Sequence, residues 1–259
     1  EDANRHVKAL PENNTNIHIH DLCFKYDGAR PDYVLEGIDL HISQGKMTAI
    51  VGASGSGKTT LVKLLLGFYT PNEGEIRIGD ENLSTFNLSW WRTQCGAVMQ
   101  EGYLFSDTIA RNIAISDYEI YLDRLRQAAR VANIAEYVEK LPLGYNTKIG
   151  QDGQGVSQGQ RQRILIARVV YKNPQFIFLD EATNSLDANN ERAIVENLSA
   201  FYKGKTVIVV AHRLSTVKHA DQIVVLDGGK IAETGTHAEL TTRHGKYYEL
   251  VKNQLELGG

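Results

Sequence analysis

The run Gly-Ala-Ser-Gly-Ser-Gly-Lys-Thr occupies residues Gly52–Thr59, between a short apolar run and an apolar helical pattern. Because glycine lacks a Cβ atom, successive backbone N–H groups of such a run can converge on phosphate oxygens at the positive start of the helix. Lys58 adds a cation for the β- and γ-phosphates, and the Thr59 hydroxyl is suited to Mg²⁺. We therefore expect a nucleotide phosphate site built from Gly52, Ser54, Gly55, Ser56, Gly57, Lys58, Thr59 and Thr60.

The segments around this run predict a strand on its amino side and a helix on its carboxyl side. Residues 47–51 form a short apolar run typical of a buried strand, and residues 58–66 have the pattern of an apolar helix. Further upstream, residues 17–26 alternate between apolar and polar, and residues 33–42 form a second strand-like run after a turn at Gly28 and Pro31. These two segments predict an antiparallel entry sheet, and residues 74–78 predict another alternating strand.

The carboxyl half alternates between helical and strand patterns. Residues 118–141 read as helical, with apolar residues at steps of three and four. This alternation predicts a parallel sheet covered by helices. The remaining expected elements are a helix over 157–171, a strand over 175–179, a helix over 188–202, a strand over 206–210, a hairpin of 221–226 with 230–233, and a helical end over 237–255.

Composition excludes some classes of protein. The 259 residues are 42% hydrophobic, and their net charge of -3 gives no bulk electrostatic reason to bind nucleic acid. The apolar runs are far shorter than the roughly 18 residues typical of a membrane span. Cys23 and Cys95 lie in apolar runs without CxxC spacing, so we expect buried free thiols.

Two carboxylates follow another apolar strand. Asp180 ends the run Phe-Ile-Phe-Leu-Asp, and Glu181 comes next. Ligands of open α/β sheets bind at the carboxyl ends of the strands, so we expect Asp180 to hold Mg²⁺ and Glu181 to orient or deprotonate the attacking water. A solvated acidic turn after the strand is the competing interpretation.

Three further positions are ambiguous when taken singly. Gln100 follows a strand-like run and could be a surface residue, His212 could be an ordinary polar residue, and Tyr26 could be a strand tyrosine that packs on the core. Val-Ser-Gln-Gly-Gln at residues 156–160 offers a second anion site, because Ser157 is a good N-cap and Gly159 allows close approach. A simple capped helix would explain Ser157, but we do not expect it to explain Gly159, Gln160 and Arg161.

Taken together, these motifs resemble the ATP-binding cassette family over nearly the whole chain. The resemblance implies an α/β fold with a RecA-like P-loop NTPase core, an antiparallel β subdomain and an α-helical subdomain. It implies that Tyr26 stacks on adenine, that Gln100 approaches Mg²⁺ or the attacking water, and that His212 contacts the γ-phosphate. Ser185-Leu186-Asp187 also lies where the family has it, which adds Asp187 to the ATP site.

The resemblance also implies a partner. In the family, two domains pair head to tail, and the signature segment of one copy covers the ATP held by the other. Ser157, Gly159 and Gln160 would then meet the nucleotide of a second copy. ATP binding would join the copies, and loss of the γ-phosphate would release them.

Two positions depart from the family pattern. Val156 and Gln158 stand where the usual signature Leu-Ser-Gly-Gly-Gln has leucine and glycine. Gln151 replaces the glutamate of the Thr-x-Val-Gly-Glu-x-Gly segment of exporter-type cassettes, which residues 147–153 resemble. We still expect ATP hydrolysis, since the hydrolytic residues remain.

Several segments are similar to nucleotide-binding domains of bacterial type I exporters, among which the peptidase-containing peptide or bacteriocin exporters are the nearest resemblance: Leu104-Phe105, Thr108-Ile109, Asn112-Ile113, residues 211–216 and residues 233–240. This predicts a polar lead-in over residues 1–16 that continues from a membrane domain of the same polypeptide. An ATPase domain would follow over 17–259, with a helical subdomain over about 101–172.

The expected location is the cytoplasmic face of a bacterial inner membrane. One alternative is a soluble cassette ATPase acting on DNA or the ribosome, which usually carries a long coiled coil or basic linker. The others are an importer ATPase subunit and a non-hydrolysing nucleotide-binding module.

Overall fold

The computed structural model describes residues 5–28, 32–115, 117–150, 153, 155–182, 185–211 and 213–257. The chain divides into two compact units, the first made of the residues up to Cys95 and from Gly204 onward, the second of Gly96–Lys203. Among the described residues, no helix has both the length and the apolar character needed to span a bilayer.

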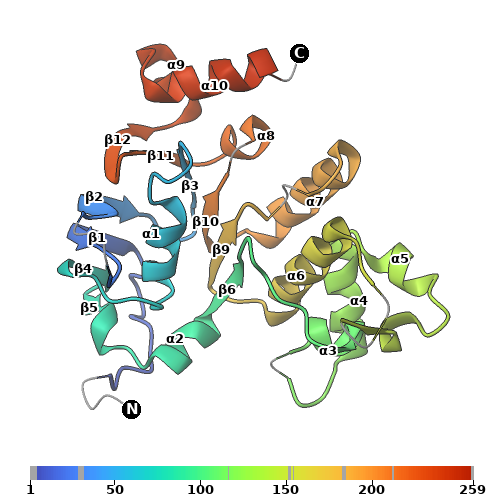
Figure 1. Ribbon diagram of the computed structural model, residues 1–259. Coiled ribbons are helices and arrows are strands. Elements are labelled where there is room, and N and C mark those ends of the chain that lie inside the picture. Colours follow the sequence, from blue (N-terminus) through green and yellow to red (C-terminus); the bar gives the residue numbers. More distant parts are fainter. Residues whose placement is uncertain are drawn as a thin grey trace. The chain divides into compact units, whose positions relative to one another are not determined.

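The first unit contains two sheets (Figure 1). One is antiparallel in the order β2-β1-β4-β5, and the strands of the other run in the order β12-β11-β3-β10. Strand β3 pairs in parallel with β10 and β11, while β12 closes the edge as an antiparallel hairpin. The elements are β1 Ile17–Phe24, β2 Leu35–Ile42, β3 Met47–Gly52, α1 Lys58–Leu65, β4 Glu73–Ile78, β5 Glu81–Asn82, η1 Leu83–Thr85, α2 Leu88–Gln94, β6 Cys95–Val98 (continuing into the second unit), β10 Thr206–Val210, α8 Leu214–Val217, β11 Gln222–Asp227, β12 Lys230–Gly235, α9 His237–Arg243 and α10 Lys246–Leu257.

Antiparallel strand β1 alternates as the sequence predicts, but it carries a bulge. Ile17 and Ile19 are buried and pair with β2, and the register then shifts before Leu22. Asp21 supplies the extra residue at φ 43°, and its N–H donates to Asp39 Oδ1 at 2.9 Å. The bulge keeps the buried side chains of β1 on one face although their spacing changes from two to three.

The lead-in is attached to the first unit. The N–H of Val7 donates to the Thr85 carbonyl at 3.0 Å, and the Val7 carbonyl accepts from the N–H of Asn87 at 2.9 Å. Asn87 is the N-cap of α2, and its Oδ1 accepts from the N–H of Trp90 at 2.9 Å. Trp91, fully buried, donates its indole N–H to the Leu65 carbonyl at the end of α1 at 3.0 Å. Helix α2 thus satisfies a carbonyl that the last turn of α1 leaves open.

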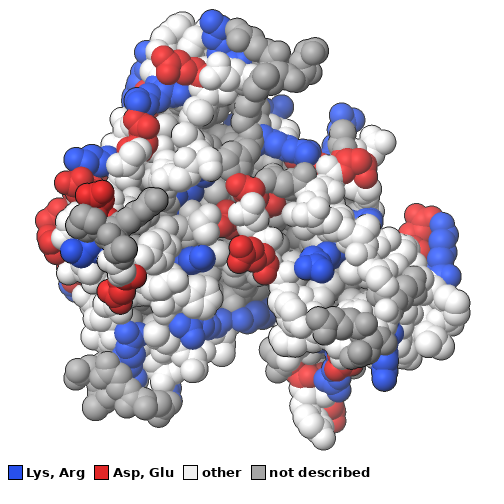
Figure 2. Space-filling model, viewed as in Figure 1, with Lys and Arg blue, Asp and Glu red and all other residues white. Residues whose placement is uncertain are grey.

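Charged side chains of both signs are interspersed over the visible face of the first unit (Figure 2). This mixture accords with the small net charge of -3. Cys23 and Cys95 are both buried free thiols, as the sequence predicts.

The second unit is mostly helical. Strand β9 neighbours β6, and a short ribbon joins β7 to β8. Helix α6 is the longest in the unit and packs against α3 and α4. The elements are β7 Asp107–Thr108, α3 Ile109–Ile113, α4 Leu122–Val131, α5 Ala135–Glu139, η2 Gly144–Asn146, β8 Lys148–Ile149, α6 Gln158–Lys172, β9 Phe176–Asp180 and α7 Ala188–Phe201.

The two regions that the sequence predicts as helical are helical, and each contains a break at a left-handed residue. The region 118–141 divides into α4 and α5, with Asn133 at φ 54° between them. The carboxyl-terminal region divides into α9 and α10, with His244 at φ 52° as the C-cap of α9. A residue in this conformation ends an α-helix, and asparagine tolerates it better than most residues do.

Candidate functional site

The loop between β3 and α1 needs its glycines. Gly52, Gly55 and Gly57 have φ values of +152°, +79° and +102°. A Cβ atom on Gly52 would lie 2.1 Å from the Leu226 carbonyl oxygen, and one on Gly57 would lie 2.6 Å from a Leu35 methyl group. No larger residue fits either position, so the backbone closes into a tight cradle at the start of α1.

Lys58 is the first residue of α1 and lies inside this loop. It is buried, and its ammonium group donates to the carbonyls of Gly52 at 2.9 Å and Ala53 at 2.8 Å. Ser56 is also buried, with its hydroxyl 3.5 Å from the ammonium. The loop therefore holds a cation at the amino end of a helix, and both features favour a bound anion.

Tyr26 lies beside the helix that follows this loop. Its hydroxyl is 2.9 Å from the Thr60 hydroxyl. The Tyr26 ring makes edge contacts with Phe24 and Tyr69, at centroid distances of 5.0 and 5.3 Å, yet the residue remains 39% exposed. The first unit thus brings together Tyr26, Thr60 and the phosphate loop, and the partly exposed ring is available for stacking.

The two carboxylates lie at the carboxyl end of β9 in the second unit. Asp180 is its last residue and is 1% exposed. Glu181 follows at φ 53°, which is an unusual backbone conformation for glutamate and costs about 1–3 kcal/mol. Backbone strain of this kind gathers at functional sites.

A residue that the sequence did not single out supports this turn. Gln162, on α6, donates its amide to the Glu181 carbonyl at 3.4 Å and accepts from the N–H of Ser185 at 3.1 Å. One amide therefore ties both ends of the segment after β9 to α6. Two other glutamines, Gln158 and Gln160, precede it in the segment, and nothing in that pattern distinguishes Gln162 as the contact.

Gln100 is exposed in the turn after β6. It lines a hollow of about 550 Å³ within the second unit, together with Gln158 and Arg161 from the start of α6. Gln158, one of the departures from the usual signature, therefore shares a surface with the predicted Gln100.

The signature segment forms a capping box. Ser157 Oγ accepts from the N–H of Gln160 at 3.2 Å, and Gln160 Oε1 accepts from the N–H of Ser157 at 2.8 Å. The expectation that a simple capped helix would leave Gln160 unexplained is therefore wrong, because Gln160 is itself half of the cap. Gly159 faces the Ser185 carbonyl, which a Cβ atom would approach to 3.2 Å.

Asp187 is the N-cap of α7. Its Oδ1 accepts from the N–H groups of Asn189 at 3.1 Å and Asn190 at 3.0 Å. These bonds, chiefly those from Asn190, lower the pKa of the Asp187 carboxyl below its ordinary value. The side chain has a structural partner within its own helix.

Two sequence-predicted positions, His212 and Gln151, lie outside the described residues. Thr59 is half-buried at the start of α1, while Ser54 and Gly55 are exposed at the tip of the loop.

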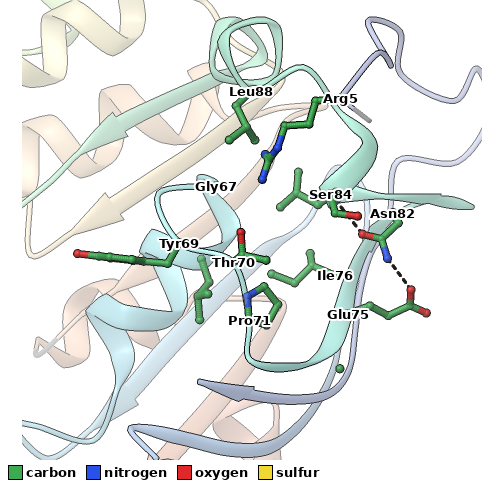
Figure 3. Close-up of a pocket in the computed structure, with 13 residues that line it drawn as sticks. Arg5, Gly67, Tyr69, Thr70, Pro71, Glu75, Ile76, Asn82, Ser84 and Leu88 are labelled. Atoms are coloured by element: carbon green, nitrogen blue, oxygen red, sulfur yellow. Dashed lines mark hydrogen bonds between the residues drawn. The ribbon is translucent and has the colours of Figure 1, made fainter. Parts of the chain in front are cut away.

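A separate pocket of about 230 Å³ lies in the first unit (Figure 3). The Arg5 guanidinium points into it, and Ile76 and Leu88 contribute apolar walls. Asn82 lies at its rim, where the side chain accepts from the N–H of Ser84 at 2.8 Å. None of the lining residues belongs to the phosphate loop, so this pocket is distinct from the candidate nucleotide site.

Comparisons with known proteins agree with these features. The family model described as "ABC transporter" matches residues 35–184. The chain is 44% identical over 238 residues to ABC transporter B family member 13 of Arabidopsis thaliana, covering 92% of this chain and 19% of that protein. It is also 44% identical over 241 residues to the alpha-hemolysin translocation ATP-binding protein HlyB of Escherichia coli O157:H7, covering 92% of this chain and 34% of that protein.

A solved structure is similar as well. It is described as a bacterial Atm1-family ABC exporter with ATP bound, and it matches with a TM-score of 0.90 and 39% identity, covering 95% of this chain and 43% of that one. The chain thus spans less than half of each of these relatives. From the matched residues and the identities, the chain belongs to the ABC transporter family, of which it is an ATP-binding domain.

Proposed function

We propose that this domain hydrolyses ATP to ADP and phosphate to drive export through a membrane domain. The observation that carries the proposal is the tight loop around Lys58, whose buried ammonium group lies at the amino end of α1. The similarity to two proteins named as exporters or translocation proteins favours export over import. We propose that the domain works at the cytoplasmic face of a membrane.

Each site residue has its own role in the proposed reaction. The loop N–H groups and Lys58 hold the phosphates, and Tyr26 supports the adenine ring. Glu181, whose backbone is left-handed, takes a proton from the attacking water or orients it. His212 and Gln100 contact the γ-phosphate region.

The oxygen donors proposed for Mg²⁺ suit that ion. They are the Thr59 hydroxyl, the Asp180 carboxylate and the Gln100 amide oxygen, and Mg²⁺ prefers oxygen ligands. Bound Mg²⁺ would neutralise charge on the β- and γ-phosphates.

The proposal includes a second copy of the chain. Gly159 at the start of α6 and the N–H groups of its first turn offer an anion site separate from the phosphate loop. The capping box uses the Gln160 side chain within the helix, so Gln160 acts first by fixing the helix start. We propose that the helix start then meets ATP held by the other copy.

Export further implies that residues 1–16 continue from a membrane domain of the same polypeptide, with the ATPase domain over 17–259 and its helical subdomain over about 101–172. The cargo class that the resemblance suggests is a peptide. No nucleic acid takes part in this function.

A comparison of three variants tests hydrolysis. Glu181→Gln should lower steady-state phosphate release by about 10²–10⁴-fold while ATP binding persists, since only the proton acceptor is lost. Lys58→Ala should weaken nucleotide binding or turnover. Glu196→Gln, an exposed carboxylate on α7, is the matched control and should keep the normal rate. Normal turnover by Glu181→Gln would remove Glu181 from the mechanism.

The same variant tests pairing. Size-exclusion chromatography of Glu181→Gln with ATP and Mg²⁺ should show a dimer that is absent with ADP. A monomer at high protein concentration would contradict the ATP-dependent pair but leave hydrolysis standing.

A further inference from the structure

The solvent face of the antiparallel sheet carries a histidine pair that the ATPase function does not use. His18 on β1 lies directly opposite His41 on β2 in the strand register. Their neighbours Ile17, Ile19, Leu40 and Ile42 are all buried, so the alternation of the strands turns both imidazoles outward. The pair is therefore fixed by two strands whose other face forms part of the core.

The Nδ1 atoms of the two imidazole rings face each other. His18 Nδ1 and His41 Nδ1 are 3.2 Å apart, and the ring centroids are 4.6 Å apart with a tilt of 54°. Two nitrogens at this separation can share one proton as a hydrogen bond. They can equally bind one metal ion, because neutral imidazole nitrogen is the commonest protein ligand of transition metals.

The separation matches a tetrahedral chelate. With Zn–N bonds of about 2.0–2.1 Å and a tetrahedral angle, two ligand nitrogens lie about 3.3–3.4 Å apart. The 3.2 Å found between His18 and His41 is within the tolerance of about 0.2 Å expected for a metal site. The distance between the two nitrogens therefore need change little for an ion to replace the shared proton.

The surroundings favour a site with two protein ligands. The described residues contain no group of three or more histidine, cysteine or acidic side chains arranged to hold a metal, so water would complete the coordination. Arg77 on β4 lies opposite His18, but its guanidinium donates to both oxygens of Glu75 at 3.3 and 3.4 Å. The nearest strand cation is thus already engaged by a carboxylate.

From this geometry we propose that His18 and His41 chelate a divalent transition-metal ion, Zn²⁺ or Cu²⁺, on the exposed face of the β1–β2 sheet. The ion would tie the two strands together through their side chains. Because it binds the folded sheet and not the extended chain, it would stabilise the domain by an amount that rises with the logarithm of the ion concentration above Kd. The site is separate from the nucleotide loop and independent of the proposed export function.

Isothermal titration of ZnCl₂ into the untagged, nucleotide-free domain tests the site. The wild type should bind one Zn²⁺ that His18→Gln and His41→Gln each bind at least about tenfold more weakly, since each loses one of two ligands. Cu²⁺ should bind the wild type more tightly than Zn²⁺, following the general order for nitrogen ligands.

His20→Gln is the matched control. His20 is an exposed histidine on the same strand, and its Nδ1 is paired with Asp39 Oδ1 at 2.9 Å. This variant should bind Zn²⁺ as the wild type does. Circular dichroism checks that all variants fold, and the thermal midpoint should rise with zinc in the wild type and His20→Gln only.

Three results would overturn the proposal. They are the absence of Zn²⁺ binding to the wild type, undiminished binding to both His18→Gln and His41→Gln, and loss of binding in His20→Gln. Cu²⁺ binding weaker than that of Zn²⁺ would also contradict chelation by two imidazoles.

Discussion

Asn112 joins the loop after Gln100 to the helical unit, and its replacement by alanine should destabilise that unit. The side chain is 1% exposed. Its Oδ1 accepts from the N–H of Phe105 at 2.8 Å, and its Nδ2 donates to the carbonyls of Phe105 and Thr108, each at 3.0 Å. One amide therefore closes the turn between residues 105 and 108.

The expected cost follows from these three bonds. Each neutral hydrogen bond contributes about 1 kcal/mol net, and a buried group left unsatisfied costs about 1–3 kcal/mol. Phe105 is 46% exposed, so water can reach part of its backbone and the cost stays near the lower end. Asn112→Ala should therefore lower the free energy of unfolding by about 2–4 kcal/mol. For a domain of this size, the melting temperature should fall by about 4–16 °C.

Arg168 on α6 makes further hydrogen bonds to the segment that contains this turn. Its guanidinium donates to the carbonyls of Asn112 at 2.7 Å and Tyr103 at 3.1 Å. Both bonds use backbone carbonyls, so they can survive Asn112→Ala, whereas a longer bond from Arg168 Nη2 to Asn112 Oδ1 at 3.4 Å is lost with the side chain. The loss of structure in Asn112→Ala should then stay within residues 103–108, and residues 103–113 should remain attached to α6.

Hydrogen exchange read by mass spectrometry, together with thermal denaturation, measures this effect. Asn112→Ala should speed exchange in peptides covering residues 103–113. Asn197→Ala is the matched control, because its exposed amide donates to the Val131 carbonyl at 3.2 Å and should cost less than about 1 kcal/mol. If both variants melt alike and exchange alike at residues 103–113, the reasoning about the buried amide fails.

Two further predictions concern single side chains. Trp91→Phe removes the N–H that donates to the Leu65 carbonyl. This variant should lower the free energy of unfolding, measured by urea titration, by about 1–3 kcal/mol. An unchanged urea midpoint would contradict this prediction. Hydrogen bonding, chiefly from Asn190, holds the pKa of the Asp187 carboxyl below its ordinary value. The contribution of this carboxylate to stability is therefore complete above the ordinary pKa and disappears as pH falls through the lower folded pKa. The stability difference between wild type and Asp187→Asn should therefore be constant at neutral pH and change in the acid range, and a difference independent of pH would refute the role of the cap.

Much of the fold could be predicted because its strands and helices follow strong patterns. The run 206–210 matches β10 to the residue, and all five of its residues are buried, as expected for a short apolar run in a covered sheet. The bulge at Asp21 could not be predicted from alternation, which breaks there by a single residue. The breaks at Asn133 and His244 depend on left-handed residues that a helical apolar pattern spans without interruption.

The candidate site likewise contains residues whose roles could be predicted from the sequence and residues whose roles could not. The phosphate-loop motif itself predicts glycine at positions 52 and 57. The structure gives the reason, because a Cβ atom on Gly52 would strike the Leu226 carbonyl oxygen and one on Gly57 would strike a Leu35 methyl group. The capping role of Gln160 has a recognisable local spacing from Ser157, which the sequence reasoning passed over. Gln162 contacts Glu181 and Ser185, which lie about twenty residues further along the chain, and no local sequence pattern predicts this contact.

The attachment of Val7 has a mechanical consequence. Hydrogen bonds link Val7 to Asn87, at the start of α2, and Trp91 of the same helix to Leu65, at the end of α1. At the opposite end of α1 is Lys58. A force applied to the amino-terminal segment at Val7 would therefore have a hydrogen-bonded route to the carboxyl end of the phosphate-binding helix.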